Sequence, residues 1–228
     1  MYTPLPEDDD QPFLISTGHL ATPPEVEALV HAAYQRYKGL DEGKVADYIP
    51  ALAKVPRGLF GICVVGVNGS SFDIGDARHE FSIQSVSKPF VFALVSEAIG
   101  TEVARARDGA NATGLPFNSV MAIALNGDRT MNPMVNAGAI ATTSLVPGDT
   151  ADAKWRFIRE GLSRFAGREL QMDQEIYESE AATNQRNQAI GALMFAYGLI
   201  EDDAKMVTDV YTRQCSINVS AKDLAVMA

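Results

Sequence analysis

The stretch "FSIQSVSKPF", residues 81–90, places a serine and a lysine three positions apart, Ser85 and Lys88, where an apolar helix begins. Residues three apart on a helix lie on one face, so the two side chains can meet. The first turn of a helix also presents free N–H groups and the positive end of the helix dipole, which stabilise an oxyanion and disfavour an ammonium ion. Apolar neighbours add desolvation, which lowers the pKa of a lysine. The pattern therefore indicates a serine nucleophile with a lysine base.

The same ten residues also fit an ordinary helix start. In that interpretation Ser85 is a helix cap and Lys88 is a solvated residue of the first turn. Ser-x-x-Lys is a short pattern that also arises by chance, so by itself it does not establish an active site. The rest of the chain has to decide between the two interpretations.

A β-hairpin is predicted on the N-terminal side of this stretch. Residues 59–67, "LFGICVVGV", and 70–76, "SSFDIGD", have the composition of strands, and Asn68 and Gly69 lie between them. Asn-Gly supplies the positive φ angles that a tight hairpin turn needs. Two strands do not form a stable sheet by themselves, so we expect other parts of the protein to cover the edges.

Helices are predicted for most of the remaining chain, because apolar residues recur at helical spacing between Gly, Pro, Asp and Ser. The predicted helices are residues 23–40, 85–100, 101–109, 153–167, 184–198, 202–214 and 220–228. Residues 45–58 contain Pro50 and Pro56 and are predicted to be a broken helix or a loop. Since no repeat or linker divides the chain, we expect one domain over 1–228, with a sheet-containing lobe (1–80) and a mostly helical lobe (81–228).

The composition excludes several classes of partner. The chain has 228 residues, of which 46% are hydrophobic, and a formal net charge of -10. An acidic protein is a poor ligand for nucleic acid or for an anionic membrane, and no segment reaches the ~18 apolar residues of a membrane span. The N-terminal "MYTPLPEDDD" lacks the basic and apolar parts of a signal peptide. We therefore expect a cytoplasmic protein without nucleic-acid or membrane partners.

Cysteine and histidine are too sparse to build a metal or disulfide framework. Cys63 and Cys215 are expected to be buried free thiols, which fits a reducing compartment. His19, His31 and His79 have no spacing that resembles a metal site. The sequence therefore predicts no metal and no other cofactor.

Two further polar stretches contain residue types suited to binding. In "NPMVNAGAI", residues 132–140, two asparagines flank a proline and are followed by small residues that allow close helix packing. In "ESEAATNQRNQAIG", residues 178–191, Glu180, Asn184 and Asn187 are predicted to lie where a loop gives way to a helix. Each of these residues taken singly is also explained as a helix cap or a surface residue.

Taken together, five segments of the chain resemble the serine-dependent glutaminases, which are relatives of the penicillin-binding proteins and β-lactamases. The segments are "DYIPALA" (47–53), "IQSVSKPF" (83–90), "NPMVNAGAI" (132–140), "SEAATNQRN" (179–187) and "VYTRQCSI" (210–217). They occur in the family's order, and together they are more specific than Ser-x-x-Lys alone. The resemblance implies an α+β, β-lactamase/DD-peptidase-like fold: an antiparallel sheet, incomplete in this chain, packed with helices and a mostly helical lobe.

The resemblance also implies a function and a set of site residues. It implies hydrolysis of L-glutamine to L-glutamate and ammonia through a γ-glutamyl ester, by a homodimer or homotetramer. The implied catalytic residues are Ser85 as nucleophile, Lys88 as general base and Tyr211 as proton donor. The implied substrate-binding residues are Gln84 in the pocket, Asn136 and Asn187 at the α-carboxylate, Glu180 at the α-ammonium, and Tyr48 and Tyr211 as lining phenols.

One departure from the family leaves alternatives open. Family members continue into a C-terminal segment that supplies further strands, another pocket tyrosine and the second oxyanion donor. The chain is therefore expected to be a fragment or a natural truncation, and inactive by itself. The alternatives are a penicillin-interacting enzyme of the same fold, which the cytoplasmic signals disfavour, and a catalytically inactive amino-acid-binding fragment.

Overall fold

The computed structural model describes residues 22–125 and 132–228, so His19 and the acidic N-terminal stretch lie outside the described residues. The described helices are α1 Pro23–Tyr37, α2 Ser87–Ile99, α3 Thr101–Asp108, α4 Met121–Leu125, α5 Asn136–Ser144, α6 Ala151–Ala166, α7 Gln174–Ala181, α8 Gln185–Ala196, α9 Ala204–Cys215 and α10 Ala221–Met227. The described strands are β1 Gly61–Val65, β2 Ser71–Gly75, β3 Phe81–Ser82 and β4 Asn218–Val219, and short 3-10 turns cover Leu52–Lys54 and Gln84–Val86.

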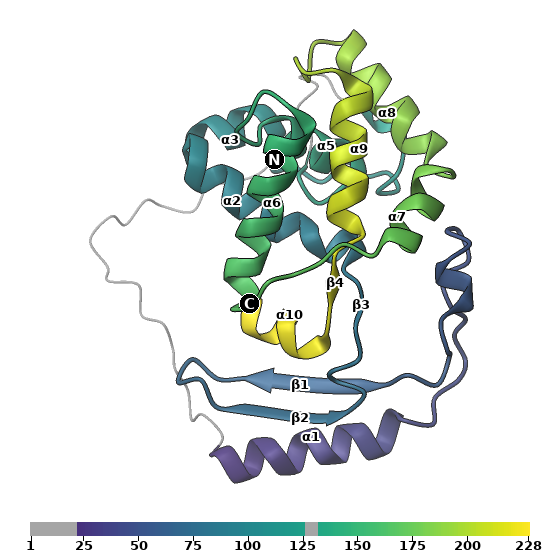
Figure 1. Cartoon of the computed structure of the whole chain (residues 1–228), viewed down its shortest axis with the longest axis vertical. Coiled ribbons are helices and arrows are strands. Elements are labelled where there is room, and N and C mark those ends of the chain that lie inside the picture. Colours follow the sequence, from purple (N-terminus) through teal and green to yellow (C-terminus); the bar gives the residue numbers. More distant parts are fainter. Residues whose placement is uncertain (1–21, 126–131) are drawn as a thin grey trace, which may run out of the picture.

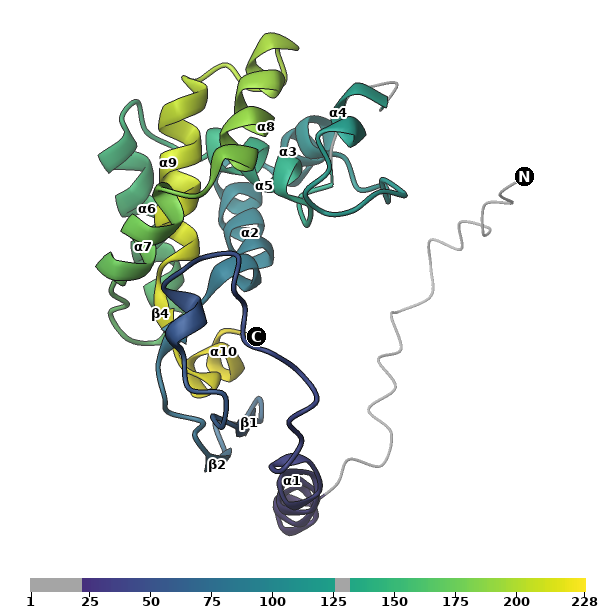
Figure 2. The same ribbon diagram turned by 90° about the vertical axis from the view of Figure 1, so that its right-hand side faces the viewer.

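Helix α9 is the centre of the helical body, in contact with α5, α6, α7 and α8 (Figure 1, Figure 2). Its buried side chains face two separate apolar clusters. Val210 belongs to a cluster built mainly from α2 and α6, whereas Val207 and Tyr211 belong to a second cluster built mainly from α5 and α8. A helix that is buried on both sides is held firmly in place. The residues near its C-terminal end are therefore well fixed for a role in a site.

The predicted hairpin is confirmed. Strands β1 and β2 pair antiparallel from Gly61 opposite Gly75 to Val65 opposite Ser71. Gly69 has φ +82°, the left-handed conformation that the tight turn requires. Helix α1 contacts β2, and α10 contacts β1, so helices from the two ends of the described chain cover the hairpin (Figure 1).

Two short strands form a second sheet within the predicted helical lobe, at its boundary with residues 1–80. In the second sheet, Phe81 of β3 pairs with Val219 of β4, and Ser82 pairs with Asn218. Because α10 packs on both α6 and β1, the helical lobe also contributes to the environment of the hairpin. No helix in the described part of the chain is both long and apolar enough to cross a membrane.

The structure corrects one placement and refines another. Glu180 is predicted to lie where a loop gives way to a helix, but it belongs to the last turn of α7, a helix whose N-terminus is capped by Asp173, which accepts from the Ile176 N–H (2.9 Å). The sequence "ESEAATNQRN" contains the end of one helix and the start of the next, so a single loop-to-helix boundary was the wrong interpretation. Both cysteines are free, but only Cys215 is buried, whereas Cys63 is partly exposed.

Candidate active site

The turn before α2 carries the predicted nucleophile. Gln84 has φ +49°, and among the described residues it is the only non-glycine with a positive φ. This conformation is unfavourable for a residue with a Cβ atom and is retained mainly where surrounding contacts enforce it. Ser85 follows directly and is exposed, whereas Ser87 and Lys88 are buried. The turn therefore presents one serine of this segment to solvent and buries the other.

Lys88 is buried next to the N-terminus of α5. Its side chain is 5% exposed, and Nζ donates a hydrogen bond to Asn136 Oδ1 at 2.8 Å. Burial lowers the pKa of Lys88, as the sequence predicted. Among the described residues the ammonium hydrogen bonds with Asn136 and not with Ser85, so the direct serine–lysine contact expected from the spacing is not formed here.

Two residues of α9 complete this side of the site. Tyr211 is 2% exposed, and burial raises the pKa of its phenol well above the ordinary value. The Ser85 hydroxyl is close enough to the phenol to oppose that shift. Burial also raises the pKa of the Cys215 thiol, one turn further along the helix. At neutral pH the Tyr211 phenol therefore keeps its proton, and the Cys215 thiol stays protonated and unreactive.

Glu180 supplies a buried carboxyl group. It is 7% exposed, and burial raises its pKa to about 7. A long hydrogen bond from Gln84 Nε2 (3.5 Å) opposes the shift, and no cation of the described residues contributes to it. A carboxylate in such surroundings is destabilised until a positive charge arrives.

A cavity of about 430 Å³ connects these groups. Its wall contains Tyr48, Ile49, Gln84, Ser85, Phe117, Asn118, Asn136, Glu180, Thr183, Asn184, Arg186, Asn187, Tyr211 and Cys215. Seven of the eight predicted site residues are in this wall, and Lys88 lies behind Asn136. Asn136 also donates from Nδ2 to Asn187 Oδ1 at 2.9 Å, so the two predicted amides are joined.

The sequence did not indicate the contribution of Phe117 and Asn118. They lie in a loop without periodicity, and what fixes this loop is a bond from the Asn136 N–H to the Phe117 carbonyl oxygen (2.8 Å). The Phe117 ring centroid lies 5.8 Å from Lys88 Nζ, within the range of a cation–π contact. The exposed aromatic residue in "PFNS" was the available signal, and it is a weak one.

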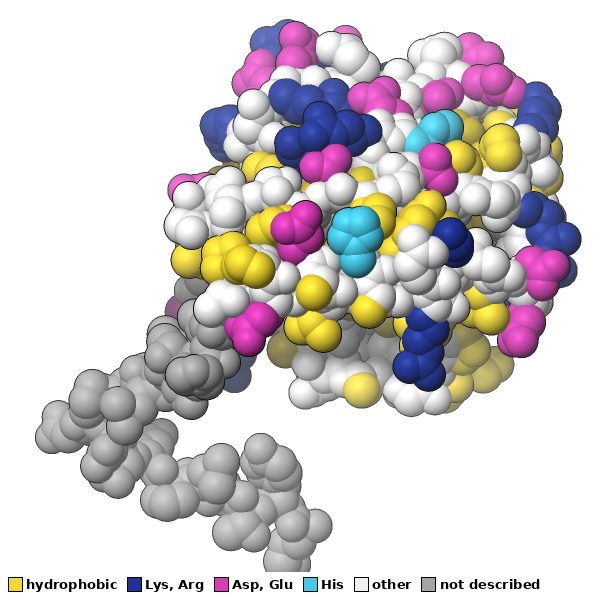
Figure 3. Space-filling model, turned by 90° about the horizontal axis from the view of Figure 1, so that it is seen from below, with side chains coloured by type: hydrophobic (Ala, Val, Ile, Leu, Met, Phe, Trp, Pro, Cys, Tyr) yellow, Lys and Arg dark blue, Asp and Glu magenta, His cyan; other side chains and the backbone are white. Residues whose placement is uncertain are grey.

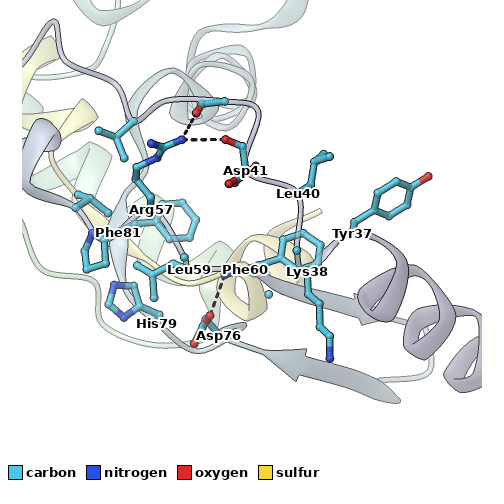
Figure 4. A pocket seen from close by; sticks show the side chains of 18 of the residues that line it. Tyr37, Lys38, Leu40, Asp41, Arg57, Leu59, Phe60, Asp76, His79 and Phe81 are labelled. Carbon is cyan, nitrogen blue, oxygen red and sulfur yellow. Dashed lines mark hydrogen bonds between the residues drawn. The ribbon is translucent and has the colours of Figure 1, made fainter.

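A larger hollow of about 800 Å³ lies between α1, β1 and the segment that connects them (Figure 4). The Arg57 guanidinium donates to the backbone carbonyls of Asp41 and Gly43, and the Phe60 N–H donates to Asp76 Oδ2 at 2.8 Å. Its lining has no serine, threonine or cysteine. Size alone therefore does not identify the site, because the candidate nucleophile and its buried base are at the smaller cavity.

Metal ligands do not gather in the described residues. No group of three or more His, Cys, Asp or Glu side chains in 22–125 and 132–228 could hold a metal ion. The cavity and the residue behind its wall bring together a hydroxyl, a buried amine, a phenol and a carboxyl group.

An exposed serine at a helix mouth, with a buried lysine one turn further and a phenol beside it in an α+β domain, is the arrangement expected for the β-lactamase-like fold. A model of the glutaminase family matches residues 43–228. The chain is 53% identical to Glutaminase 2 of Yersinia pestis over 228 residues, which cover 99% of this chain and 67% of that protein. The chain belongs to the glutaminase family.

Solved structures agree with this assignment. The structure of the probable glutaminase ybaS matches with a TM-score of 0.86 and 37% identity, over 89% of this chain and 66% of that one. The structure of Mglu in its tris and glutamate form matches with a TM-score of 0.82 and 32% identity, over 89% of this chain and 45% of that one. The chain thus spans about two thirds or less of the length of these relatives.

Proposed function

We propose that the protein hydrolyses the side-chain amide of L-glutamine to L-glutamate and ammonia. The observation that carries this proposal is Glu180, a carboxyl group 7% exposed in a cavity that also contains Ser85, with no described cation contributing to its pKa. A free amino acid brings the missing positive charge in its α-ammonium group. The related Mglu has been solved in a form with glutamate, the product of such a reaction.

The pocket residues divide the substrate between them. Glu180 pairs with the α-ammonium, and the amides of Asn136 and Asn187 hold the α-carboxylate. Gln84 and the exposed Tyr48 line the sides of the cavity. With both ends of the amino acid held in this way, the side-chain amide faces Ser85.

The residues around Ser85 then supply the proton transfers. Ser85 Oγ attacks the amide carbon while neutral Lys88 accepts the hydroxyl proton. The C–N bond breaks as Tyr211 protonates the departing ammonia, and the phenol regains a proton from Lys88. Water attacks the γ-glutamyl ester, gives one proton to Lys88, and glutamate leaves as Ser85 is reprotonated. The sum is glutamine plus water to glutamate plus ammonium.

The test is replacement of Ser85 by alanine in the natural polypeptide that contains this sequence. Ser85→Ala should abolish ammonia release from glutamine and leave the melting temperature unchanged, because the lost hydroxyl is exposed and contributes little packing. Ser96→Ala, further along α2, is the matched control and should retain wild-type activity. Retention of more than a few per cent of activity in Ser85→Ala would assign the nucleophile elsewhere.

We also propose that residues 1–228 belong to one catalytic domain, of which they lack the C-terminal part, and that the protein acts in the cytoplasm as a homodimer or homotetramer. Two free thiols fit a reducing compartment. Light scattering coupled to size-exclusion chromatography measures the assembly, and a monomeric mass at micromolar concentration would contradict the oligomer.

A further inference from the structure

A buried polar pair lies beneath the turn that carries Ser85. Ser87 is 0% exposed and Gln214 is 1% exposed. The Ser87 hydroxyl donates to the Gln84 carbonyl oxygen at 2.7 Å, and Gln214 Nε2 donates to Ser87 Oγ at 2.9 Å. The pair thus connects the centre of the helical body to the backbone of the nucleophile turn.

The Gln84 carbonyl matters because of the peptide bond to which it belongs. The nitrogen of that peptide is the Ser85 N–H, and in a trans peptide the C=O and N–H groups point in opposite directions. No cis peptide occurs among the described residues. Holding the Gln84 carbonyl inward therefore directs the Ser85 N–H outward, where an oxyanion donor is needed.

The turn needs such a restraint because Gln84 is strained. At φ +49° its backbone is in the left-handed region, which side chains with a Cβ atom disfavour. Its carbonyl oxygen accepts from both the Ser87 N–H and the Ser87 hydroxyl. Conformations of this kind persist where neighbouring groups over-determine them. Gln214 in turn fixes the rotamer of the Ser87 hydroxyl.

We infer that Ser87 and Gln214 are positioning residues for the acylation step, which fix the Gln84–Ser85 peptide plane so that Ser85 N–H and Oγ face the reacting amide. This inference rests on the proposed glutaminase function. Ser87 is excluded as a second nucleophile, because it is inaccessible and its one hydroxyl hydrogen is used by the Gln84 carbonyl.

An unsatisfied atom supports a functional role for Gln214. Its Oε1 is buried and has no hydrogen-bond partner among the described residues. A buried acceptor without a partner destabilises the folded state, and native proteins keep few of them. An apolar side chain of similar volume would remove that cost. The amide is retained here even though one of its two ends is unpaired, which is expected if the bond to Ser87 serves catalysis.

The first experiment compares two buried serines with the same local chemistry. Ser216 is also 0% exposed, and its hydroxyl donates to the Thr212 carbonyl oxygen at 2.9 Å and not to a carbonyl of the turn. Ser87→Ala should lower kcat for glutamine at least tenfold with KM within twofold, because a misdirected peptide plane affects the transition state more than substrate binding. Ser216→Ala should stay within threefold of the wild type in kcat and KM.

The second experiment separates positioning from stability. Gln214→Met keeps the volume, removes the donor to Ser87 and also removes the unpaired Oε1. We expect kcat to fall at least fivefold while the melting temperature stays equal or rises. A residue with a purely structural role would show activity and stability falling together.

Hydrogen exchange distinguishes failure of this inference from failure of the proposed function. Amide exchange in the peptide that contains residues 84–88 should be faster in Ser87→Ala than in the wild type, and unchanged in Ser216→Ala. If the wild type does not hydrolyse glutamine, the proposed function is wrong, and exchange alone decides whether the pair restrains the turn. If the wild type is active and the kcat of Ser87→Ala equals that of the wild type or that of Ser216→Ala, the positioning role is overturned.

Discussion

Helix α5 and the β1–β2 hairpin differ sharply in how they are held. Residues from Asn136 to Thr143 of α5 are all buried, whereas neither β1 nor β2 contains a fully buried residue. Helix α1, which lies against the hairpin, buries only Val30. Figure 3 shows the molecule from below relative to Figure 1, from the side of α1 and the hairpin. Hydrophobic side chains are exposed there between charged ones. The proposed catalytic residues Ser85, Lys88 and Tyr211 belong to the helical body, which is the tightly packed part of the protein.

The difference in packing indicates which site residues are held precisely in place. The predicted nucleophile, base and proton donor lie on α2, its preceding turn and α9, which pack within the helical body. Among the predicted site residues, Tyr48 comes from the segment between α1 and the hairpin, and it is 67% exposed. Catalysis depends on sub-ångström placement, whereas a rim residue tolerates motion. Substitutions in the two parts should therefore have effects of different size and kind.

The largest effect is expected at Lys88, where packing and chemistry coincide. Lys88→Arg should lower kcat by about 1,000-fold, similar to Lys88→Ala, because a guanidinium does not give up its proton at working pH and the buried site has no room for it. Steady-state ammonia release measures the loss. Lys54→Arg, at an exposed lysine paired with Glu175 of α7, is the control and should leave activity unchanged.

An active Lys88→Arg variant would contradict the assignment of Lys88 as the general base. It would mean that the base is elsewhere, and Tyr211, buried beside Ser85, would be tested next with Tyr211→Phe.

The second effect is a pH dependence of stability that arises inside the helical body. Asp108 at the end of α3 is 0% exposed, and burial raises its pKa from 3.8 to about 7, although the Thr142 hydroxyl donates to Oδ2 at 2.6 Å. Its Oδ1 has no partner among the described residues. Between pH 3.8 and about 7, the folded state therefore keeps a proton that the unfolded chain has released. The contribution of Asp108 to the free energy of unfolding is fully present below pH 3.8 and is lost as the pH rises to about 7.

Asp108→Asn removes this titration. The pKa differs by about three units between the unfolded and folded states, and each unit corresponds to ~1.36 kcal/mol. At pH 8 the free energy of unfolding of the variant should therefore exceed that of the wild type by up to about 4 kcal/mol. The gap should vanish near pH 4. Urea titrations at both pH values measure it, and a gap that does not change with pH would show that Asp108 does not titrate in this range.

The third prediction compares how much a core substitution in the helical body and one in the hairpin lower the free energy of unfolding. Leu162→Ala in α6, at a side chain that is 0% exposed, should lower the free energy of unfolding by about 3 kcal/mol. Val64→Ala in β1, at a side chain that is 39% exposed, should lower it by less than about 1 kcal/mol. Urea denaturation midpoints give both values. Equal losses would show that the hairpin is as firmly held as the helical body.

The smallest effect concerns binding. Glu180→Gln should raise KM for glutamine by about 10- to 150-fold, or about 1.5 to 3 kcal/mol, with kcat within threefold, because one charge-assisted hydrogen bond to the α-ammonium is lost. N-acetylglutamine lacks that ammonium and should be a poor substrate of the wild type. Equal turnover of the two compounds would remove Glu180 from the substrate-binding site.

Local signals explain what could be predicted from the sequence. Asn68 and Gly69 specified the hairpin turn, and apolar periodicity specified most helices, because both depend on neighbours in the chain. The order of the five segments identified the residues that line the cavity. The strained φ of Gln84 and the Lys88–Asn136 bond were not foreseen, because they depend on contacts between distant segments. The Ser87–Gln214 bond joins residues 127 positions apart, and no local pattern indicates it.

The wall of the cavity that carries Tyr48 has a consequence for the timing of folding. This wall is attached by a bond from the Ala51 N–H to Ser179 Oγ, 128 positions later, and by a small cluster of Ile49, Ala51 and Ile176. At ~5–20 residues per second, a ribosome needs roughly 6 to 26 s to make the partner segment. Throughout that interval the cluster around Ile49 lacks Ile176, so during synthesis this wall of the cavity is completed only after α7 has emerged.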